Sequence, residues 1–364
     1  PAERALALRS LAAVASKQGA FQVAEKQLQK SLSLYQELHD EPGAAIARTR
    51  LGAARHQQGE YDAARTLYEQ SLQQFEALGD RWGKGAALHR LGHLAYELGQ
   101  YDEAQRLYAQ RLEIARAVGD RRGAAASLNN LGNVFYARGN YKEAERHYLE
   151  GLASWQELGN RWGTALAYNN LGLIATEREA YADARRCFQD SLALCRAIGD
   201  RRGIALALNN LGELASQQGA LHEAREYHEE SLALFREIGQ SRGIMYALNF
   251  LGAVALDNGE HARAATYYRE ALELALAQQT APRALDSLAG LATVLHEEGK
   301  GRQAAEILAL VLDTSATEEA TRDRAEALLD TIQATLPGDQ IAAARRRGQQ
   351  ADWQALATRL LQSA

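Results

Sequence analysis

The chain has little of the residues that interrupt helices or cross-link a fold. Its 364 residues include 4 prolines, 2 cysteines and 1 methionine. Scarce proline, together with abundant Ala, Leu, Glu, Gln and Arg, favours helix almost throughout and leaves no obvious place for strands. Cys187 and Cys195 lie eight residues apart, or about 12 Å along a helix, which is too far for a disulfide. We therefore expect free thiols and a reducing, cytoplasmic location.

The chain also lacks an excess of positive charge and a long apolar run. The formal net charge is −5 and the pI is near 6.1, which argues against nonspecific binding to nucleic acid or to a membrane surface. No apolar stretch approaches the length of a membrane span, and no signal peptide is evident. Because the sequence starts at Pro1 and not at an initiator Met, we expect it to be part of a longer protein.

What the chain has in abundance is repetition at a step of forty residues. The segment 128–132 (LNNLG) recurs as 168–172 (YNNLG), and the segment 119–123 (GDRRG) recurs as 159–163 (GNRWG) and 199–203 (GDRRG). A fixed step of this length indicates a repeat array, whose core forms between neighbouring units. We therefore predict one elongated array instead of two or three separate domains.

Aligning the repeated Leu-Gly pairs predicts eight units of two helices each. The predicted units are 5–44, 45–84, 85–124, 125–164, 165–204, 205–244, 245–284 and a shorter one at 285–316. In the third unit, the first helix is expected from about Trp82 to Leu98 and ends at Gly99, which can adopt the left-handed conformation. The second helix is expected to begin near Tyr101, and Asp120 is a good N-cap for the helix that follows.

Two small residues recur where the helices of a pair should cross. One is the glycine after the repeated leucine, and the other is an alanine in the second helix. The alanines are Ala24, Ala64, Ala104, Ala144, Ala184, Ala224, Ala264 and Ala304. We expect the two helices to pack closely there, so that a larger residue would force them apart. Most first helices also end at a glycine, but Glu179 takes that place in the fifth unit.

The pattern resembles that of a known family. Leu91-Gly92 is followed by Gly99, Tyr101, Ala104 and Tyr108, and this order of residues resembles the tetratricopeptide repeat. Two departures are a period of forty residues instead of thirty-four and the lack of a proline that closes the second helix. The resemblance implies an all-α fold, an α-solenoid that forms a right-handed superhelix of about eight helix-turn-helix units over residues 1–316.

The repeat pattern stops in the last part of the chain. Residues 317–364 are predicted to form a short helical cap, with helices at about 317–336, 340–347 and 352–361. The forty-residue units resemble those of spindle-orientation adaptors and of the sensor arms of bacterial STAND ATPases and regulators, and the tail favours the bacterial proteins. This resemblance implies a peptide-binding or protein-binding module, the sensor or scaffold arm of a larger bacterial signalling protein with an NTPase or effector domain in the parent chain.

In such arrays the first helices line a concave groove, which implies that the two residues before each repeated leucine point into or beside it. The first position reads Arg9, Thr49, His89, Asn129, Asn169, Asn209 and Asn249, and the second reads Ser10, Arg50, Arg90, Asn130, Asn170, Asn210 and Phe250. Further candidates on these helices are His93, Asn133, Tyr136, Glu213 and Asp257.

Side-chain amides suit the main chain of an extended peptide, because each offers two donors and an acceptor. We expect the asparagine row at Asn129 to bind a ligand. The row at Asn130 fits two interpretations, ligand binding or a tie between neighbouring helices. Basic residues lie in the N-terminal half of the candidate groove and acidic ones toward the C-terminal half, so an acidic stretch of the ligand should dock early.

His89, His93 and Glu97 are spaced i, i+4 and i+8 and could offer three metal ligands. The sequence around His89 lacks the glutamate of the zinc-protease motif, and the chain has no phosphate-binding loop. We therefore expect groove-lining histidines, no metal, no cofactor and no catalysis. The alternative to a peptide-binding module is a small-molecule sensor, the tetratricopeptide domain of a transcriptional regulator that does not itself contact nucleic acid.

Overall fold

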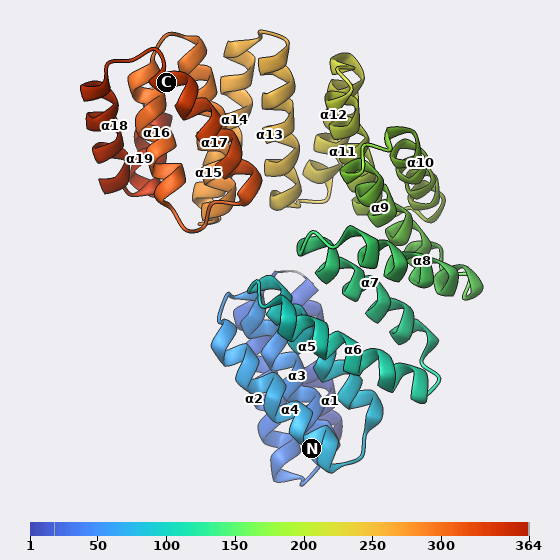
Figure 1. The fold of residues 1–364 in the computed structure, drawn as a ribbon. Coiled ribbons are helices and arrows are strands. Elements are labelled where there is room, and N and C mark those ends of the chain that lie inside the picture. Colours follow the sequence, from blue (N-terminus) through green and yellow to red (C-terminus); the bar gives the residue numbers. More distant parts are fainter. Residues whose placement is uncertain (18, 363–364) are drawn as a thin grey trace. The chain divides into compact units, whose positions relative to one another are not determined.

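The structure, a computed structural model, describes residues 1–17 and 19–362 (Figure 1). In this part of the chain it has nineteen α-helices and no β-strand, which confirms the predicted all-α solenoid. The first nine helices are α1 (Ala2–Lys17), α2 (Phe21–Glu37), α3 (Glu41–Gln57), α4 (Tyr61–Ala77), α5 (Arg81–Glu97), α6 (Tyr101–Ala117), α7 (Arg121–Ala137), α8 (Tyr141–Glu157) and α9 (Arg161–Glu177). The others are α10 (Tyr181–Ile198), α11 (Arg201–Gln217), α12 (Leu221–Glu237), α13 (Ser241–Asp257), α14 (His261–Ala277), α15 (Ala281–Glu297), α16 (Gly301–Asp313), α17 (Glu319–Gln333), α18 (Gly338–Gln350) and α19 (Trp353–Gln362).

The chain folds into two compact units, and we describe each by itself. Unit 1 comprises Pro1–Ile174 and unit 2 comprises Ala175–Ala364, so the boundary falls within α9. The predicted division into an array (1–316) and a cap (317–364) follows the repeat pattern and not compactness, and it stays a prediction.

The starts of many first helices are set by a capping side chain. The Oδ1 atom of the capping residue accepts a hydrogen bond, 2.8 to 3.0 Å long, from the backbone N–H three residues later. The capping residues are Asp40, Asp80, Asp120, Asn160 and Asp200. The N–H that donates belongs to a glycine in each case, and at Gly83 an added Cβ would lie 2.1 Å from the Phe75 ring. The same glycine thus completes the cap and admits an aromatic residue from the preceding helix.

The turns between helices confirm the predicted stop signals. Gly99 has a φ of 70° and Gly119 a φ of 72°, both in the left-handed region. Glu179 adopts the same conformation with a φ of 57°. A residue with a side chain is strained in this conformation, so Glu179 costs this turn some stability relative to glycine.

Close packing within each helix pair depends on the two small residues predicted from the repeat. A Cβ added at Gly132 would lie 2.4 Å from the Tyr148 ring, and one added at Gly212 would lie 2.7 Å from the ring of His228. The recurring alanines of the second helices, for example Ala104, are 0% exposed. The ring of the second helix therefore lies directly on the backbone of the first.

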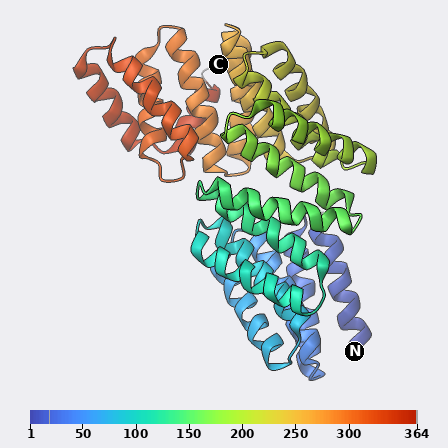
Figure 2. The same ribbon diagram turned by 45° about the vertical axis from the view of Figure 1, so that its right-hand side comes forward.

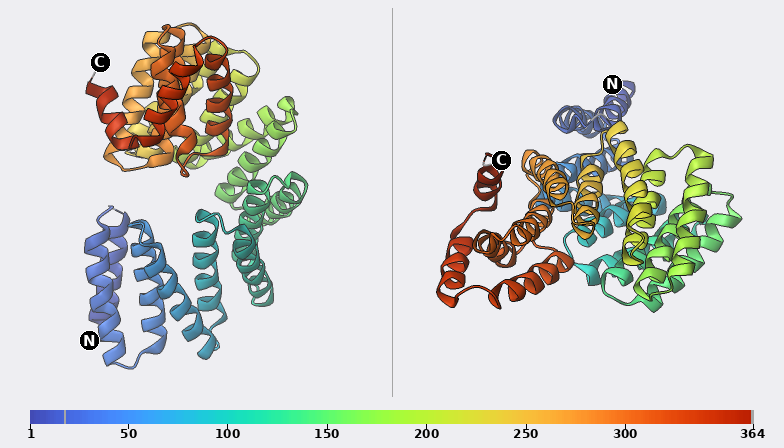
Figure 3. Two further views of the ribbon diagram at one scale, coloured as in Figure 1. Left: turned by 60° about the vertical axis from the view of Figure 1, so that its left-hand side comes forward. Right: turned by 90° about the horizontal axis from the view of Figure 1, so that it is seen from above.

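From α1 to α8 in unit 1, and from α10 to α17 in unit 2, each helix packs against the next along the chain. The N-terminal helices of unit 1 lie side by side and are joined by short turns (Figure 3, left). Successive first helices also contact one another, as α3 does with α5 in unit 1, and α11 with α13 and α13 with α15 in unit 2. This closer approach marks the inner side of the array in each unit.

The end of unit 2 departs from the helix-pair pattern. Helix α18 packs on α16, α17 packs on α15 and α16, and α19 packs on α14 and α15, so the last helices cover the final repeat (Figure 2). Ile332, Ile341 and Leu356 join the same apolar core as Leu288 and Leu308 of that repeat.

None of the described helices combines the length and the apolar character that a bilayer-spanning segment needs.

Candidate functional site

The exposed face of the first helices in unit 1 is basic. Arg50 and Arg90 are exposed on α3 and α5, and within the described residues neither guanidinium has an acidic partner. Partial burial lowers the pKa of Arg50, and the nearby charges of Arg9 and Arg90 lower this pKa further. Both neighbouring arginines thus repel Arg50, and this part of the face favours a negatively charged ligand.

His89 lies beside these arginines but is held within the chain. Its Nδ1 atom is 3.3 Å from the Nδ2 atom of Asn130 on α7. Burial, with smaller effects of Arg111, Arg90 and His93, lowers the pKa of His89 to about 3. His89 is therefore a neutral polar group of the α5–α7 contact at physiological pH.

The structure corrects the asparagine row that we expected to face the groove. Asn129 is 6% exposed, Asn209 is 1% exposed and Asn249 is 8% exposed. Each is hydrogen-bonded within the chain. Asn129 accepts from Asn170 at 2.9 Å, Asn209 is 2.8 Å from His228 Nδ1, and Asn249 donates to Asp286 at 2.7 Å. The physical reason is that this position faces a neighbouring helix, where an amide must be paired. Asn169, the remaining member, is half-buried.

The second row is mixed. Asn170 is 7% exposed and ties α9 to α7 through Asn129, whereas Asn130 and Asn210 are half-buried. Phe250 stacks on His228 with ring centroids 4.9 Å apart. The helix-tie interpretation therefore holds for Asn170, and ligand contact stays a prediction for the half-buried amides.

Two other candidates on α7 are partly occupied by contacts within unit 1. Asn133 accepts a hydrogen bond of 2.8 Å from the hydroxyl of Tyr148. Tyr136 packs against Tyr141 with ring centroids 5.5 Å apart. Both Asn133 and Tyr136 are half-buried, so each leaves only part of its side chain for a ligand.

The two acidic candidates lie in unit 2, Glu213 on α11 and Asp257 on α13. Burial and the charge of Glu177 raise the pKa of Glu213, and burial raises the pKa of Asp257. Sequence reasoning missed Asp286, whose side chain is 14% exposed and forms an ion pair with Arg324 and hydrogen bonds with Asn249 and Thr321. The sequence did contain a signal for Asp286: the two preceding units have apolar residues, Leu206 and Tyr246, at its repeat position, so a charged residue there is a departure from the pattern.

The structure also corrects the set of residues that groups around His93. The Nε2 atom of His56 bonds to the carboxylate of Glu97, and the Nε2 atom of His93 lies 3.8 Å from the other oxygen of that carboxylate. His56, and not His89, completes this group. The separations of 37 and 41 residues equal those of the Asn133–Asn170 and Asn129–Asn170 contacts. A register of 37 and 41 between successive first helices could have identified the group.

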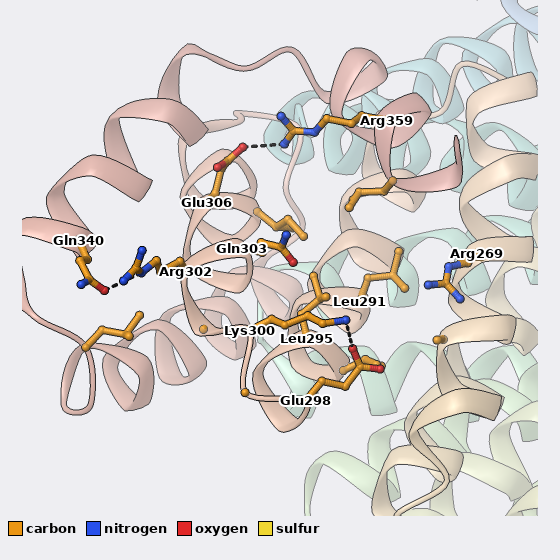
Figure 4. Close-up of a pocket in the computed structure, with 17 residues that line it drawn as sticks. Arg269, Leu291, Leu295, Glu298, Lys300, Arg302, Gln303, Glu306, Gln340 and Arg359 are labelled. Atoms are coloured by element: carbon orange, nitrogen blue, oxygen red, sulfur yellow. Dashed lines mark hydrogen bonds and ion pairs between the residues drawn. The ribbon is translucent and has the colours of Figure 1, made fainter. Parts of the chain in front are cut away.

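A cavity of about 880 Å³ lies in unit 2, between the last repeat and the C-terminal helices (Figure 4). Leucine, valine and isoleucine side chains form part of its wall, and charged and amide side chains line much of the rest. Most of these charges are paired. Lys300 bonds to Glu298, Arg359 bonds to Glu306, and Arg302 donates to Gln340. The cavity thus has a mixed wall of apolar and polar side chains, and most of its charges are paired with one another.

The repeat pattern of the chain matches known family models. A family model described as "Tetratricopeptide repeat" matches residues 3–77, 84–157 and 163–237, and a second model of the same description matches residues 246–278. No curated protein matches the chain in sequence.

Several solved structures share the fold. BtubC (BKLC) from P. vanneervenii is 22% identical, with 61% of this chain and 93% of that chain covered and a TM-score of 0.53. A STAND protein with a tetratricopeptide repeat sensor from Pyrococcus horikoshii is 17% identical, with 94% and 50% covered and a TM-score of 0.58. The apo quorum sensor NprR from B. thuringiensis is 14% identical, with 96% and 98% covered and a TM-score of 0.61. At these low sequence identities, the similarity shows a shared fold and not a shared function.

Proposed function

Because the chain belongs to the tetratricopeptide repeat family, a family of protein-interaction modules, we propose that it binds an extended, acidic segment of a partner protein. The segment lies on the first helices of unit 1, where it contacts Arg50 on α3 and Arg90 on α5. The role is one of binding and not catalysis. The module works in the cytoplasm, where Cys187 and Cys195 remain free thiols.

The repelling arginines are the observation that carries this proposal. Arg50 and Arg90 are exposed, and Arg9 and Arg90 lower the pKa of Arg50, so like charges lie within reach of one another. Most other exposed arginines of unit 1 sit in ion pairs, such as Arg116 with Glu150. A carboxylate ligand would relieve the repulsion and gain charge-assisted hydrogen bonds, which are the stronger kind.

The spacing of the helices suggests the form of the ligand. Packed helices lie about 8–10 Å apart, and an extended chain rises about 3.3 Å per residue. Two carboxylates about three residues apart would therefore reach successive first helices. The half-buried amides of Asn130 and Asn133 lie on α7, the next first helix, and are candidates for bonds to the main chain of the same segment.

The test is fluorescence anisotropy with a labelled twelve-residue peptide that carries Asp or Glu at every third position. We expect binding that weakens as salt rises. Arg50→Glu and Arg90→Glu should each weaken it about tenfold or more, since hydrogen bonds to charged groups contribute about 1.5–3 kcal/mol. A peptide with Lys in place of the acidic residues should not bind.

Arg81→Glu is the matched control, because Arg81 is exposed at the start of α5 and the substitution changes the net charge equally. It should leave the affinity within about twofold of the native value if the effect is local. Equal losses in all three variants would reduce the interaction to general attraction between charges, and the proposal for this face would be rejected.

We also propose that the module is the sensor or scaffold arm of a larger bacterial signalling protein of the STAND type. Support comes from the likeness to the STAND protein with a tetratricopeptide repeat sensor, half of whose chain is matched. The parent gene product provides the test. An NTPase domain in the same polypeptide is expected, whereas a parent chain with no NTPase or effector domain would contradict this assignment.

A small-molecule sensor is the second candidate, and the cavity in unit 2 favours it. A wall of Leu291, Leu295 and Leu360 with Arg269 at the edge suits an apolar ligand that carries an acidic group. A thermal-shift screen of small apolar carboxylic acids tests this candidate. A rise in the unfolding midpoint that is lost in Arg269→Ala would support it, and no rise with any acid would count against it.

A further inference from the structure

His56, His93 and Glu97 bring two imidazoles and a carboxylate together in unit 1. One ligand-capable atom from each residue lies within 4.8 Å of the other two. His56 comes from α3, while His93 and Glu97 are one turn apart on α5, a spacing that puts two ligands on the same helix face. The group therefore joins two successive first helices.

The separations are close to those of a metal site. A tetrahedral ion with bonds of about 2.0–2.2 Å holds its donor atoms about 3.4 Å apart. The His93 Nε2 atom is 3.8 Å from Glu97 Oε1, and His56 Nε2 bonds directly to Glu97 Oε2. The rings of His56 and His93 have centroids 5.5 Å apart. Only small rotations of the side chains would bring all three donors to one ion.

His56 is held in place before any ion binds. It is 6% exposed and packs edge-on against the rings of Tyr61 and Tyr68. Its Nδ1 atom lies 3.5 Å from the hydroxyl of Tyr68, on the side of the ring away from Glu97. The Glu97 carboxylate accepts, so Nε2 carries the ring proton in this contact. A metal at Nε2 would leave the ring proton on Nδ1, where the Tyr68 hydroxyl can accept it, as outer hydrogen bonds do in known sites.

The group is not part of the repeat pattern. The equivalents of His93 in the next two units are Asn133 and Leu173, and the equivalents of His56 are Tyr96 and Tyr136. Packing of the helix pairs therefore does not require histidine at either position. The 37-residue and 41-residue register brings two histidines and a glutamate together at this pair of first helices.

From this arrangement we infer that His56, His93 and Glu97 form a binding site for a divalent transition-metal ion, best suited to Zn²⁺. Two nitrogens and one carboxylate oxygen match the ligand types that zinc prefers. The side chains of His93 and Glu97 are 45% and 39% exposed, so the fourth position opens to solvent. Water or a carboxylate of a bound segment would occupy it. The site goes beyond the proposed peptide binding and does not depend on it.

Isothermal titration of the metal-free chain with Zn²⁺ tests the inference. We expect one ion per chain and a higher unfolding midpoint in its presence. Three variants take their residues from neighbouring repeats or keep the shape, so the fold should persist: His56→Tyr, His93→Asn and Glu97→Gln. Each should weaken Zn²⁺ binding more than about 100-fold, because each removes a direct ligand, and second-shell changes alone cost about 10–100-fold.

His89→Asn is the matched control. His89 lies one turn before His93 on α5 but bonds to Asn130, and Asn occupies its position in the next repeat. Zn²⁺ affinity should be unchanged in this variant. The inference is overturned if the wild-type chain binds no stoichiometric Zn²⁺, if the three ligand variants bind as tightly as the wild type, or if His89→Asn weakens binding as much as they do. Circular dichroism of each variant verifies that the helices are intact.

Discussion

Unit 1 and unit 2 use the same packing positions but carry different charged residues on the ligand-facing side of their first helices. Unit 1 presents Arg50 and Arg90, while unit 2 presents Glu213 and Asp257. Like charges lower the pKa of Arg50 in unit 1, and the charge of Glu177 adds to burial in raising the pKa of Glu213 in unit 2. The repeat thus constrains the residues between helices, whereas the side chains on the ligand-facing side can differ from unit to unit.

The largest expected effect is a loss of stability, and it tests whether both units depend on the same close contact between a first-helix glycine and a ring of the second helix. Gly132→Val in unit 1 and Gly212→Val in unit 2 each place side-chain atoms where a ring of the second helix lies. Each should lower the free energy of unfolding by about 3 kcal/mol, the upper part of the usual range for overpacking. Chemical denaturation of the two variants measures this.

Gly151→Ala is the control, because its added Cβ would have its nearest neighbour at 3.7 Å. This change should be neutral or stabilising by up to about 1 kcal/mol, since Ala is the better helix former. If the valine variants lose no more stability than Gly151→Ala, the close approach of ring and backbone does not govern the packing.

The next effect is a pH dependence in unit 2. His228 is buried between Asn209 and Phe250, and burial lowers its pKa to about 3 from the ordinary value of 6.5. Between these two values the unfolded chain binds a proton that the folded chain does not, so stability falls as the pH drops below 6.5. The slope for one group is about 1.4 kcal/mol per pH unit, or about 2 kcal/mol at pH 5.

His228→Phe should remove this contribution, because Phe188 holds the equivalent position in the preceding repeat. Hydrogen exchange in α11 to α13 at pH 7 and pH 5 is the measurement. Exchange in the wild type should accelerate at the lower pH more than in the variant, after correction for the intrinsic rates. An identical pH response of the two proteins would rule out His228 as the cause.

A smaller effect separates the two asparagine rows. Asn129→Ala should cost about 1–2 kcal/mol of stability, because it leaves the buried amide of Asn170 without its closest partner. Asn130→Ala should cost less than about 1 kcal/mol, since Asn130 is half-buried. Thermal unfolding of both variants checks this order. If Asn130→Ala costs more stability than Asn129→Ala, Asn129 would again be a candidate for ligand contact.

The smallest effect concerns one turn. Glu179 is exposed and has a φ of 57°, where the equivalent residue of the preceding unit is Gly139 with a φ of 69°. Glu179→Gly should raise the free energy of unfolding by about 1 kcal/mol, because glycine adopts this conformation without strain. Gly139→Glu should lower it by a similar amount. A destabilising effect of Glu179→Gly would mean that the side chain contributes more than its strain costs.

The helices and their ends were predictable from the sequence because local physics decides them. Asp80 and Gly99 act within one turn of their own positions, as a cap and as a left-handed stop. The alanine at Ala104 repeats at every forty-residue step and the glycine at Gly92 at most of them, so their role between the helices of a pair could also be inferred. These features depend on short-range geometry that the chain encodes in neighbouring residues.

The candidate site was predicted only in part. Exposure of Arg50 and Arg90 agrees with the expected basic start of the groove, but Asn129 and Asn209 are buried and paired. Asn209 and Asn210 are adjacent on one helix and differ only in which neighbour they face. The repeat pattern alone could not separate them, because both rows recur at the same step.

The sequence alone was enough to predict the fold class, the approximate boundaries of the repeat helices and the small residues that let the helices of a pair touch. The contacts of His56 with Glu97 and of Asn249 with Asp286 depend on the tertiary structure. The reason is the register between successive first helices, where residues 37 and 41 apart come into contact. That register follows from how the units stack in space, and no single unit contains both partners.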